Sequence, residues 1–272
     1  MAIDSFKKVL WEAAVISEFR KTSVADLIST KPVKTDGTKV VFNKLKTSDV
    51  KDYTGSVDWG EVATEPVELL FDKKKYWAVT MEDLDEVQSQ KDLMVDIVTD
   101  ETAKIREVED TDFLATASKG AKSLVKTPVV LNAKNVYDSI VDLGTALAKS
   151  KAPKKDRYVV VNAEILGLLA KDDRFTKDDR FTRNPSVLEN GIVEGQLINT
   201  MQVVQCEELP TGTILAMHKS AIGFGRCFEK VEAMRLQNAF ADGVRGLDNY
   251  GSVVLRPEAA ATLKYTLEAP QA

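Results

Sequence analysis

The feature that most constrains the fold is a long stretch that contains no residue able to break a helix or strand. Between Val67 and Lys119 the chain has neither glycine nor proline, so nothing interrupts a regular element there. Val67 to Met81 is rich in β-branched and aromatic residues and predicts a strand. The rest predicts a helix from Lys91 to about Ala117, which would be roughly 40 Å long at 1.5 Å per residue.

An apolar stripe along this helix should face the protein interior. Its members recur at helical spacing: Met94, Ile97, Val98, Ile105, Val108, Phe113 and Leu114. Acidic residues crowd the approach to the helix, where they favourably meet the positive end of its dipole: Glu82, Asp83, Asp85 and Glu86. We interpret them as stabilising the start of the helix, in preference to an acid–base pair.

A second strand precedes the first and predicts a hairpin-like arm. Lys39 to Leu45 is β-branched and follows a turn signal at Asp36 and Gly37. With a dozen residues each way, such an arm would reach on the order of 40 Å. A compact chain of 272 residues has a radius of gyration of only about 19 Å. Arm and helix therefore predict an extended subunit, a shape that rarely serves a monomer.

The remaining elements predict an amphipathic N-terminal helix and a compact α/β domain. The N-terminal helix would carry its apolar face on residues 6 to 16, and docking on this chain's core or on a neighbouring copy are both open. The expected downstream elements are a helix from Asn135 to Lys149, a strand from Tyr158 to Val161, a helix from Ala163 to Ala170, paired strands at Met201–Cys206 and Thr213–His218, and two strands around Pro257 that have the option of returning over the long helix.

Composition excludes several classes of protein. A net charge of -5 and a pI near 5.2 argue against a protein whose main task is to neutralise nucleic-acid phosphates. Cys206 and Cys227 are too few for a disulfide framework, although one disulfide between them is possible. Asp4 and Glu12 interrupt what would be the apolar core of a secretory signal. No apolar run approaches the roughly 20 residues that span a bilayer, so we expect no membrane segment.

Motifs for chemistry are scarce. The only histidine, His218, is expected at the end of a strand, and no nucleophile signature accompanies it. Gly223 to Arg226 reads GFGR, which lacks the third glycine of a dinucleotide fingerprint. The duplicated KDDRFT of residues 171 to 182 is interpreted as a charged loop, because calcium-loop spacing is missing. We predict no catalytic residue, no cofactor and no metal, and so no enzyme.

Charge is distributed in two opposite blocks. Glu82 to Asp112 holds twelve acidic and three basic residues, a local charge of -9, whereas Lys31 to Lys51 holds six lysines and two aspartates, a local charge of +4. Complementary charge fixes register and partner choice, so we hypothesise that the arm of one copy lies over the helix of the next. Two separately solvated faces are the alternative. The predicted contact residues are Lys39, Lys44, Lys46, Lys51, Tyr53, Trp59, Asp92, Asp96, Asp100 and Glu107.

The order of elements resembles the major capsid proteins of tailed bacteriophages. The strings LLFDKKKYWAVTMEDLDEVQSQKDLM and FADGVRGLDNYGSVVLRPEA are similar to those of phages of Gram-positive hosts. The resemblance implies an α+β, HK97-like capsid fold, which encapsulin compartments share. It implies an N-arm (1–34), an extended loop hairpin (35–81), a peripheral domain with a long spine helix (82–130), an axial α/β domain (131–228) and a return to the peripheral domain (229–272).

The same resemblance implies a structural role. It implies self-assembly, as pentamers and hexamers, into an icosahedral head shell around double-stranded DNA that is bound without sequence specificity. A separate scaffolding protein and a portal protein would be partners, and the chain would reside in the host cytoplasm before assembly and in the virion capsid afterwards. Two alternatives remain open, an encapsulin-like nanocompartment shell and, from a different class, an oligomeric enzyme with a dimerisation arm.

Overall fold

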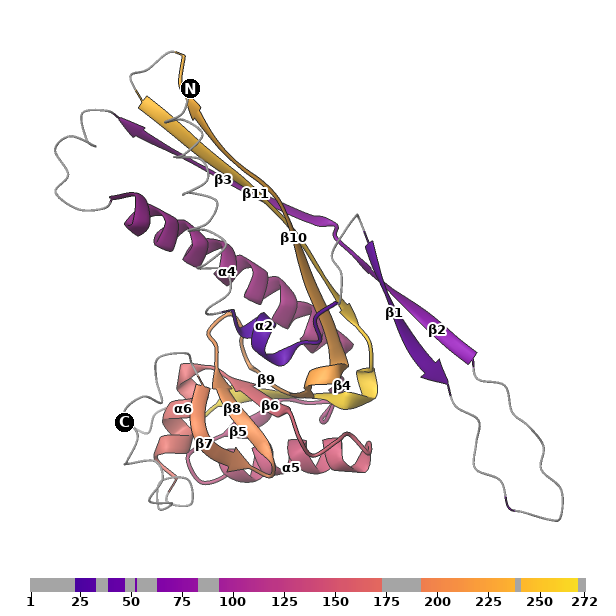
Figure 1. Cartoon of the computed structure of the whole chain (residues 1–272). Helices are drawn as coiled ribbons and strands as arrows, with labels where there is room; N and C mark the ends of the chain where they lie inside the picture. The colour runs from indigo at the N-terminus through magenta and orange to yellow at the C-terminus, as the bar shows by residue number, and fades with distance from the viewer. Residues whose placement is uncertain are drawn as a thin grey trace.

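The structure is a computed structural model of the 272-residue chain and describes residues 23–32, 39–46, 52, 63–82, 93–172, 192–237 and 241–268. Within these ranges the fold is α+β, with three sheets and one long helix (Figure 1). The predicted N-terminal helix, and the duplicated KDDRFT beyond Asp172, lie outside the described residues.

The arm is a two-stranded antiparallel sheet that projects from the body (Figure 1). β1 (Lys39–Lys46) pairs with β2 (Ala63–Leu70) in unbroken register. The strand at Lys39 is confirmed, but the single strand predicted from Val67 to Met81 is wrong. It is two strands, because β3 (Lys73–Glu82) leaves the arm and pairs with β11 (Ala241–Val254). Each arm strand therefore has eight residues and spans about 26 Å.

The break between β2 and β3 has a specific cause. Phe71 is buried, and its ring lies 3.2 Å from the position that a Cβ on Gly225 would take. The side-chain amide of Asn249 donates hydrogen bonds to the carbonyl of Phe71 at 3.0 Å and to that of Lys73 at 3.2 Å. Burial of the ring and these two bonds hold the backbone where it leaves one sheet and enters another, although no glycine or proline marks the position.

The long helix lies across one face of a three-stranded sheet of order β10-β11-β3 (Figure 1). The helix, α4 (Leu93–Gly120), confirms the predicted one, and its 28 residues span about 42 Å. β10 (Ile222–Arg235) and β11 pair along almost their whole length. Trp77 of β3 is buried against Gly246 of the neighbouring strand, a position where any side chain would collide with the indole.

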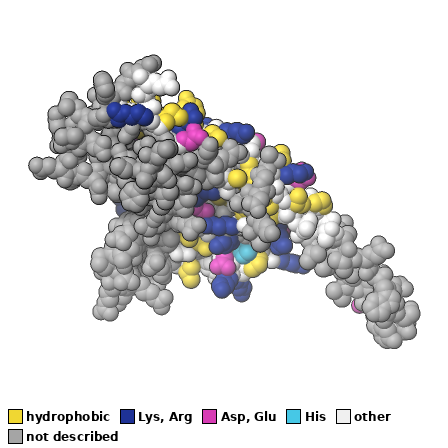
Figure 2. Space-filling view, turned by 45° about the horizontal axis from the view of Figure 1, so that its top comes forward, with side chains coloured by type: hydrophobic (Ala, Val, Ile, Leu, Met, Phe, Trp, Pro, Cys, Tyr) yellow, Lys and Arg dark blue, Asp and Glu magenta, His cyan; other side chains and the backbone are white. Residues whose placement is uncertain are grey.

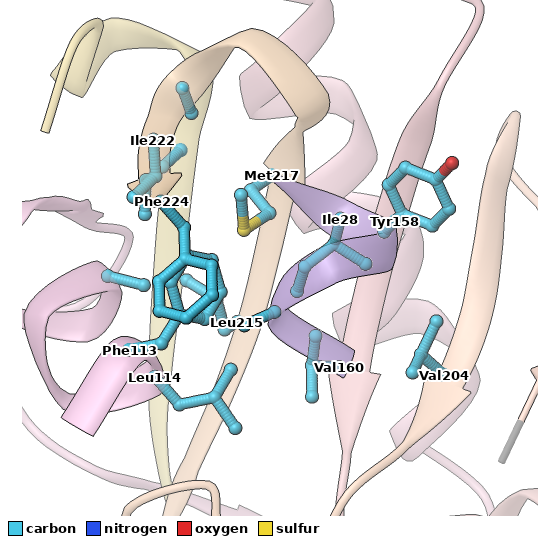
Figure 3. Packing of buried hydrophobic residues seen from close by; sticks show 14 of the residues in the cluster. Ile28, Phe113, Leu114, Tyr158, Val160, Val204, Leu215, Met217, Ile222 and Phe224 are labelled. Atoms are coloured by element: carbon cyan, nitrogen blue, oxygen red, sulfur yellow. The ribbon is translucent and has the colours of Figure 1, made fainter. Parts of the chain in front are cut away.

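An apolar cluster joins this sheet to the α/β domain. Phe113 of α4 meets Phe224 of β10 edge to face at 5.6 Å, and Ile28 of the short helix α2 (Val24–Ile28) is buried in the same cluster. Figure 3 shows Ile28 beside Met217, Tyr158 and Val160 of the α/β domain. The two parts of the chain therefore share one continuous core.

The α/β domain is built on a mixed sheet of order β4-β12-β9-β6-β8-β7, with β5 on β12. The predicted helices are confirmed as α5 (Val136–Lys149) and α6 (Ala163–Ala170). The strands and 3-10 turns are β4 (Lys122–Ser123), β5 (Val129–Leu131), β6 (Arg157–Val161), β7 (Ile192–Ile198), β8 (Met201–Gln205), β9 (Thr213–His218), η2 (Lys219–Ala221), η3 (Pro257–Ala259) and β12 (Ala260–Leu267).

The predicted pairing of β8 with β9 is wrong. β6 lies between them, parallel to β8 and antiparallel to β9. Each residue of β6 is buried, which is the pattern of a central strand covered on both faces. The turn at Pro210 to Gly212 therefore connects β8 to β9 across β6, although its sequence is typical of a hairpin turn. The two strands around Pro257 are confirmed as β11 and β12, and both contact α4.

Candidate subunit-contact site

The base of the arm packs on the glycines of the GFGR segment. This segment lies in β10, a strand, so no phosphate-binding loop surrounds it. A Cβ on Gly223 would come within 2.9 Å of the Phe42 ring, and one on Gly225 within 2.9 Å of Pro32 and 3.1 Å of Leu69. The glycines therefore leave room for the inner face of the arm.

The outer face of the arm is exposed and partly apolar. Side chains alternate along β1, so Phe42 faces the body while Lys39 and Val41 face outward. Val41 is 45% exposed and Leu70, in the paired strand, 52% exposed. A two-stranded ribbon is marginally stable in water by itself. An exposed apolar strip on such a ribbon is a surface that gains stability when another surface covers it.

Two of the predicted arm residues have partners within the chain. Lys39 binds Glu68 across the strand pair at 2.8 Å, and Lys44 lies 3.8 Å from Glu258. Both pairs are solvent-exposed and therefore weak, so both lysines remain accessible. Lys46 ends β1. The other predicted arm residues, Lys51, Tyr53 and Trp59, lie outside the described residues.

The acidic residues of α4 divide between two faces. Asp100 and Glu107 are exposed, and Asp100 forms an ion pair with Lys104 at 2.6 Å. Asp96 lies near the start of α4, and Asp92 lies outside the described residues. Glu109 and Asp110 are buried instead. Only part of the charge counted in the sequence is therefore available to a neighbouring copy.

The buried stripe of α4 differs from the predicted one. Ile105, Phe113 and Leu114 are buried as expected, but Val108 is 40% exposed. Glu109 takes its place on the inner face and is fully buried. Sequence reasoning missed this because a glutamate on an acidic helix ordinarily faces water. The arginine that offsets its charge, Arg226, lies 117 residues away in the chain.

Arg226 links three elements through two carboxylates. Its Nη2 donates to Oε2 of Glu109 at 2.9 Å, and its Nη1 lies 2.7 Å from Oδ2 of Asp26 in α2. Asp248 of β11 is also fully buried beside Glu109. Burial raises the pKa of both Glu109 and Asp248, and Arg226 offsets only part of the effect.

Asp110 attaches α2 to the long helix. Its carboxylate accepts hydrogen bonds from the backbone N–H of Val24 at 3.1 Å and of Ala25 at 2.9 Å. These N–H groups lie in the first turn of α2, where no partner exists within the helix. Asp110 therefore caps a helix that is distant in sequence. Capping residues are normally sought next to the helix they cap, so this role is not visible in the sequence around α2.

Charge on the surface is uneven. Figure 2 shows a face on which the Lys and Arg side chains of the described residues cover more area than Asp and Glu. The whole chain, in contrast, has a net charge of -5. Three of the acidic residues, Glu109, Asp110 and Asp248, are buried and so contribute little to the charge of the surface.

The described residues assemble no recognisable catalytic centre. His218 ends β9 as predicted, and its Nδ1 accepts a hydrogen bond from the backbone N–H of Ser220 at 3.1 Å. Cys206 and Cys227 are both free thiols, so the possible disulfide is not formed. Two surface hollows, one beside Asn132 and Glu164 and the other along Lys119 and Lys264, contain neither histidine nor cysteine.

Metal and membrane sites are equally absent from the part of the chain that the structure describes. No group of three or more His, Cys, Asp or Glu side chains there is arranged to hold a metal ion. None of the helices described there combines the length and apolar character needed to cross a bilayer.

Comparison with solved structures identifies the architecture. A structure from Mycobacterium phage Che8 matches with a TM-score of 0.67 and 23% identity, covering 89% of this chain and 91% of that one. The chain has the HK97-like capsid fold. The capsid of cyanophage P-SCSP1u matches with a TM-score of 0.67 and 14% identity, covering 92% of this chain and 90% of the other.

A third similar structure is a virus-like particle from Pyrococcus furiosus. It matches with a TM-score of 0.56 and 15% identity, covering 93% of this chain and 98% of that one. No protein-family model and no curated protein matches the sequence. These three matches cover 89%, 92% and 93% of the chain, so the similarity is not confined to one part of it.

Proposed function

We propose that the chain is a major capsid protein that self-assembles into the icosahedral head shell of a tailed bacteriophage. The observation that carries this proposal is the HK97-like fold over nearly the whole chain, with structures from phage particles covered to a similar extent. A projecting arm with an exposed apolar outer face supports it, since such an arm gains stability when a neighbouring subunit covers it.

The segments then take the roles that the resemblance assigns. We divide the chain into an N-arm (1–34), an extended loop (35–81), a peripheral domain containing α4 (82–130), an axial domain (131–228) and a return to the peripheral domain (229–272). Because β3 pairs with β11, the last part of the extended loop is anchored in the peripheral sheet, and the projecting part is β1 with β2.

The proposed contact places the arm of one copy over α4 of the next. The basic side comprises Lys39, Lys44, Lys46 and Lys51, with Tyr53 and Trp59. The acidic side comprises Asp92, Asp96, Asp100 and Glu107. Within the chain, Lys39 and Lys44 are weakly paired with Glu68 and Glu258. In the proposed contact, exposed carboxylates of the neighbour replace these partners or bind beside them.

The proposed partners follow from the shell. Copies of this chain form pentamers and hexamers, and a separate scaffolding protein and a portal protein join the assembly. Double-stranded DNA fills the shell without sequence-specific binding. The subunit is made in the host cytoplasm and ends in the virion capsid, with no cofactor and no catalytic role.

A second candidate is a compartment shell that encloses protein cargo. It is supported by the similarity to the virus-like particle from Pyrococcus furiosus. No observation favours the third alternative, an oligomeric enzyme with a dimerisation arm.

Electron microscopy of the expressed chain, alone and with a candidate scaffolding protein, tests the proposal. Closed shells of uniform size are expected in at least one condition. Co-purification of a cargo enzyme in place of DNA or scaffold supports the compartment alternative. Uniform small monomers in every condition contradict both kinds of shell.

A further inference from the structure

The buried carboxyl groups of Glu109 and Asp248 lie side by side without enough donors to satisfy them. Both residues are fully buried. Arg226 donates to one oxygen of Glu109. Among the described residues, no well-formed hydrogen bond reaches the other oxygen of Glu109 or either oxygen of Asp248. The backbone N–H of Asn249 lowers the pKa of Asp248 but offsets only part of the effect of burial. Buried polar groups are normally hydrogen-bonded, so this arrangement requires an explanation.

One proton between the two carboxyls satisfies the arrangement. Two ionised carboxylates are only acceptors, whereas a protonated carboxyl also has an O–H donor. Glu109 and Asp248 are close enough for such a hydrogen bond, with Glu109 as the donor. Two carboxyls that share a site ordinarily hold one proton between them, because both ionised forms together repel. Glu109 is then neutral and Asp248 is charged.

The pair is connected to the start of the arm region through Arg226. This guanidinium contacts Glu109 at 2.9 Å and Asp26 of α2 at 2.7 Å. α2 is only five residues long, and its Ala25 and Ile28 are buried against the rest of the protein. After α2, Thr30 donates its backbone N–H to the carbonyl of Ile222 at 2.9 Å. α2 thus holds the chain on the body just before the arm.

We propose that Glu109 and Asp248 share one proton, and that this proton acts as a switch that keeps α2 docked on the long helix through Arg226 and Asp26. With the proton in place, the negative charges of Asp248 and Asp26 face Arg226 among the described residues. Without it, the charge of Glu109 is added to them. The proposal concerns the subunit itself and does not rest on the shell function.

The charged and titratable groups around the pair come from each packed element. They are Asp26 and its exposed partner Lys31 near α2, Asp110 and Asp112 on α4, Arg226 on β10, Tyr250 on β11 and Lys73 on β3. Lys73 and Tyr250 are both engaged with Asp112, and Asp110 with the backbone of α2. Among the described residues, Arg226 is therefore the cation that contacts the pair, through Glu109.

Loss of the proton is expected to release α2 before it disturbs the rest. Glu109 and Asp248 lie on long elements that are held by extensive pairing and packing. Asp26 lies on a short helix whose Val24, Asp26 and Leu27 are only partly buried, and the exposed Lys31 offers it a second partner at 3.0 Å. The excess negative charge is relieved most easily when Asp26 moves away, because that costs the fewest buried contacts.

Amide hydrogen exchange of the full chain at pH 6 and pH 10 tests the proposal, with protection factors corrected for intrinsic exchange. We expect protection of residues 24–30, relative to β6 in the same molecule, to fall about tenfold at pH 10. In Glu109→Gln the side chain is a permanent neutral donor, so the relative protection should be the same at both pH values. Asp248→Asn should behave in the same way. Glu164→Gln, at an exposed position of α6 outside the proposed arm contact, should keep the wild-type response.

Three results would overturn the proposal. One is a relative protection of residues 24–30 in the wild type that does not change between the two pH values. Another is a Glu109→Gln or Asp248→Asn variant with the wild-type loss of protection. A third is a larger loss of protection in β6 than in residues 24–30, which would place the pH-sensitive event outside α2. Near-UV circular dichroism at pH 6 shows whether each variant is folded. If neither variant folds, the change in relative protection of residues 24–30 in the wild type decides for or against the proposal.

Discussion

The carboxylate of Asp110 accepts a hydrogen bond of 2.8 Å from the hydroxyl of Ser23, although 87 residues separate them in the chain. The same carboxylate accepts the first two N–H groups of α2. One side chain of the long helix thus supplies the N-terminal cap that α2 lacks locally, since the Ser23 hydroxyl caps no N–H of its own helix. This carboxylate is one of the contacts that position the segment leading into the arm.

Replacement of Asp110 by alanine is expected to lower the free energy of unfolding by about 2–4 kcal/mol. The change removes a charged acceptor and leaves two buried N–H groups and a hydroxyl without a partner. Urea unfolding of the variant and the wild type measures the difference. Asp100→Ala, at an exposed position on the same helix, should cost less than about 1 kcal/mol. Equal costs at the two positions would contradict the capping role.

The Glu109 carboxyl should make stability depend on pH in a definite direction. Burial raises its pKa from 4.5 to about 9, so the folded chain binds this proton more tightly than the unfolded chain. The stabilisation of the folded chain by this proton is complete below the pKa that Glu109 has in the unfolded chain. It is lost as the pH rises toward 9. Between pH 6 and pH 9 the wild type should lose on the order of 2–4 kcal/mol more than Glu109→Gln.

Urea unfolding across this pH range measures the effect as a difference between two curves. Other groups titrate as well; for example, burial also raises the pKa of Asp110. Their contribution is common to both proteins and cancels in the difference. Glu107→Gln provides the matched exposed control and should run parallel to the wild type. If the Glu109→Gln curve also runs parallel to the wild type, Glu109 does not retain its proton in the folded chain.

Gly251→Ala is expected to disrupt the junction between the arm and the body. A Cβ at this position would overlap the backbone carbonyl of Leu70, which a side-chain rotation does not relieve. We expect a loss of more than about 2 kcal/mol in stability. Gly167→Ala in α6 is the matched control, because a Cβ there meets nothing within 4 Å. It should stabilise the chain by about 0.5–1 kcal/mol, and thermal unfolding should separate the two variants.

Reversal of the arm charges should block assembly and leave the subunit folded. The triple variant is Lys39→Glu, Lys44→Glu and Lys46→Glu. In it, Lys39 and Lys44 lose exposed pairs, each worth less than about 1 kcal/mol. Sedimentation and electron microscopy should show folded, unassembled subunits in place of shells. Adding Asp100→Lys and Glu107→Lys on the helix should restore shells if arm and helix touch. Normal shells from the triple variant would contradict the proposed contact.

Regular elements with a local origin were predictable. α5 and α6 form where apolar spacing predicted them, and α4 differs from its predicted bounds by a few residues at each end. The HK97-like fold was implied by a resemblance to a known family, whereas these helices were expected from their own residues. Such features depend on the residues of one segment, whose periodicity the sequence displays directly.

The errors arose where distant segments compete for the same place. β6 inserts between β8 and β9 because its apolar residues need cover on both faces. The strand expected from Val67 to Met81 divides at Phe71, whose ring packs beside Gly225 more than 150 positions later. Neither local pattern contains the partner that determined the outcome.

The sequence by itself therefore determined the long helix, the arm strand at Lys39 and the opposite charges of their segments. Only the tertiary structure decided which acidic residues of the helix face the protein interior. Glu109 and Asp110 are tolerated there because Arg226 and the first turn of α2 come to meet them from other parts of the chain. A buried carboxylate is stable only with such partners, and partners distant in sequence are brought together by folding alone.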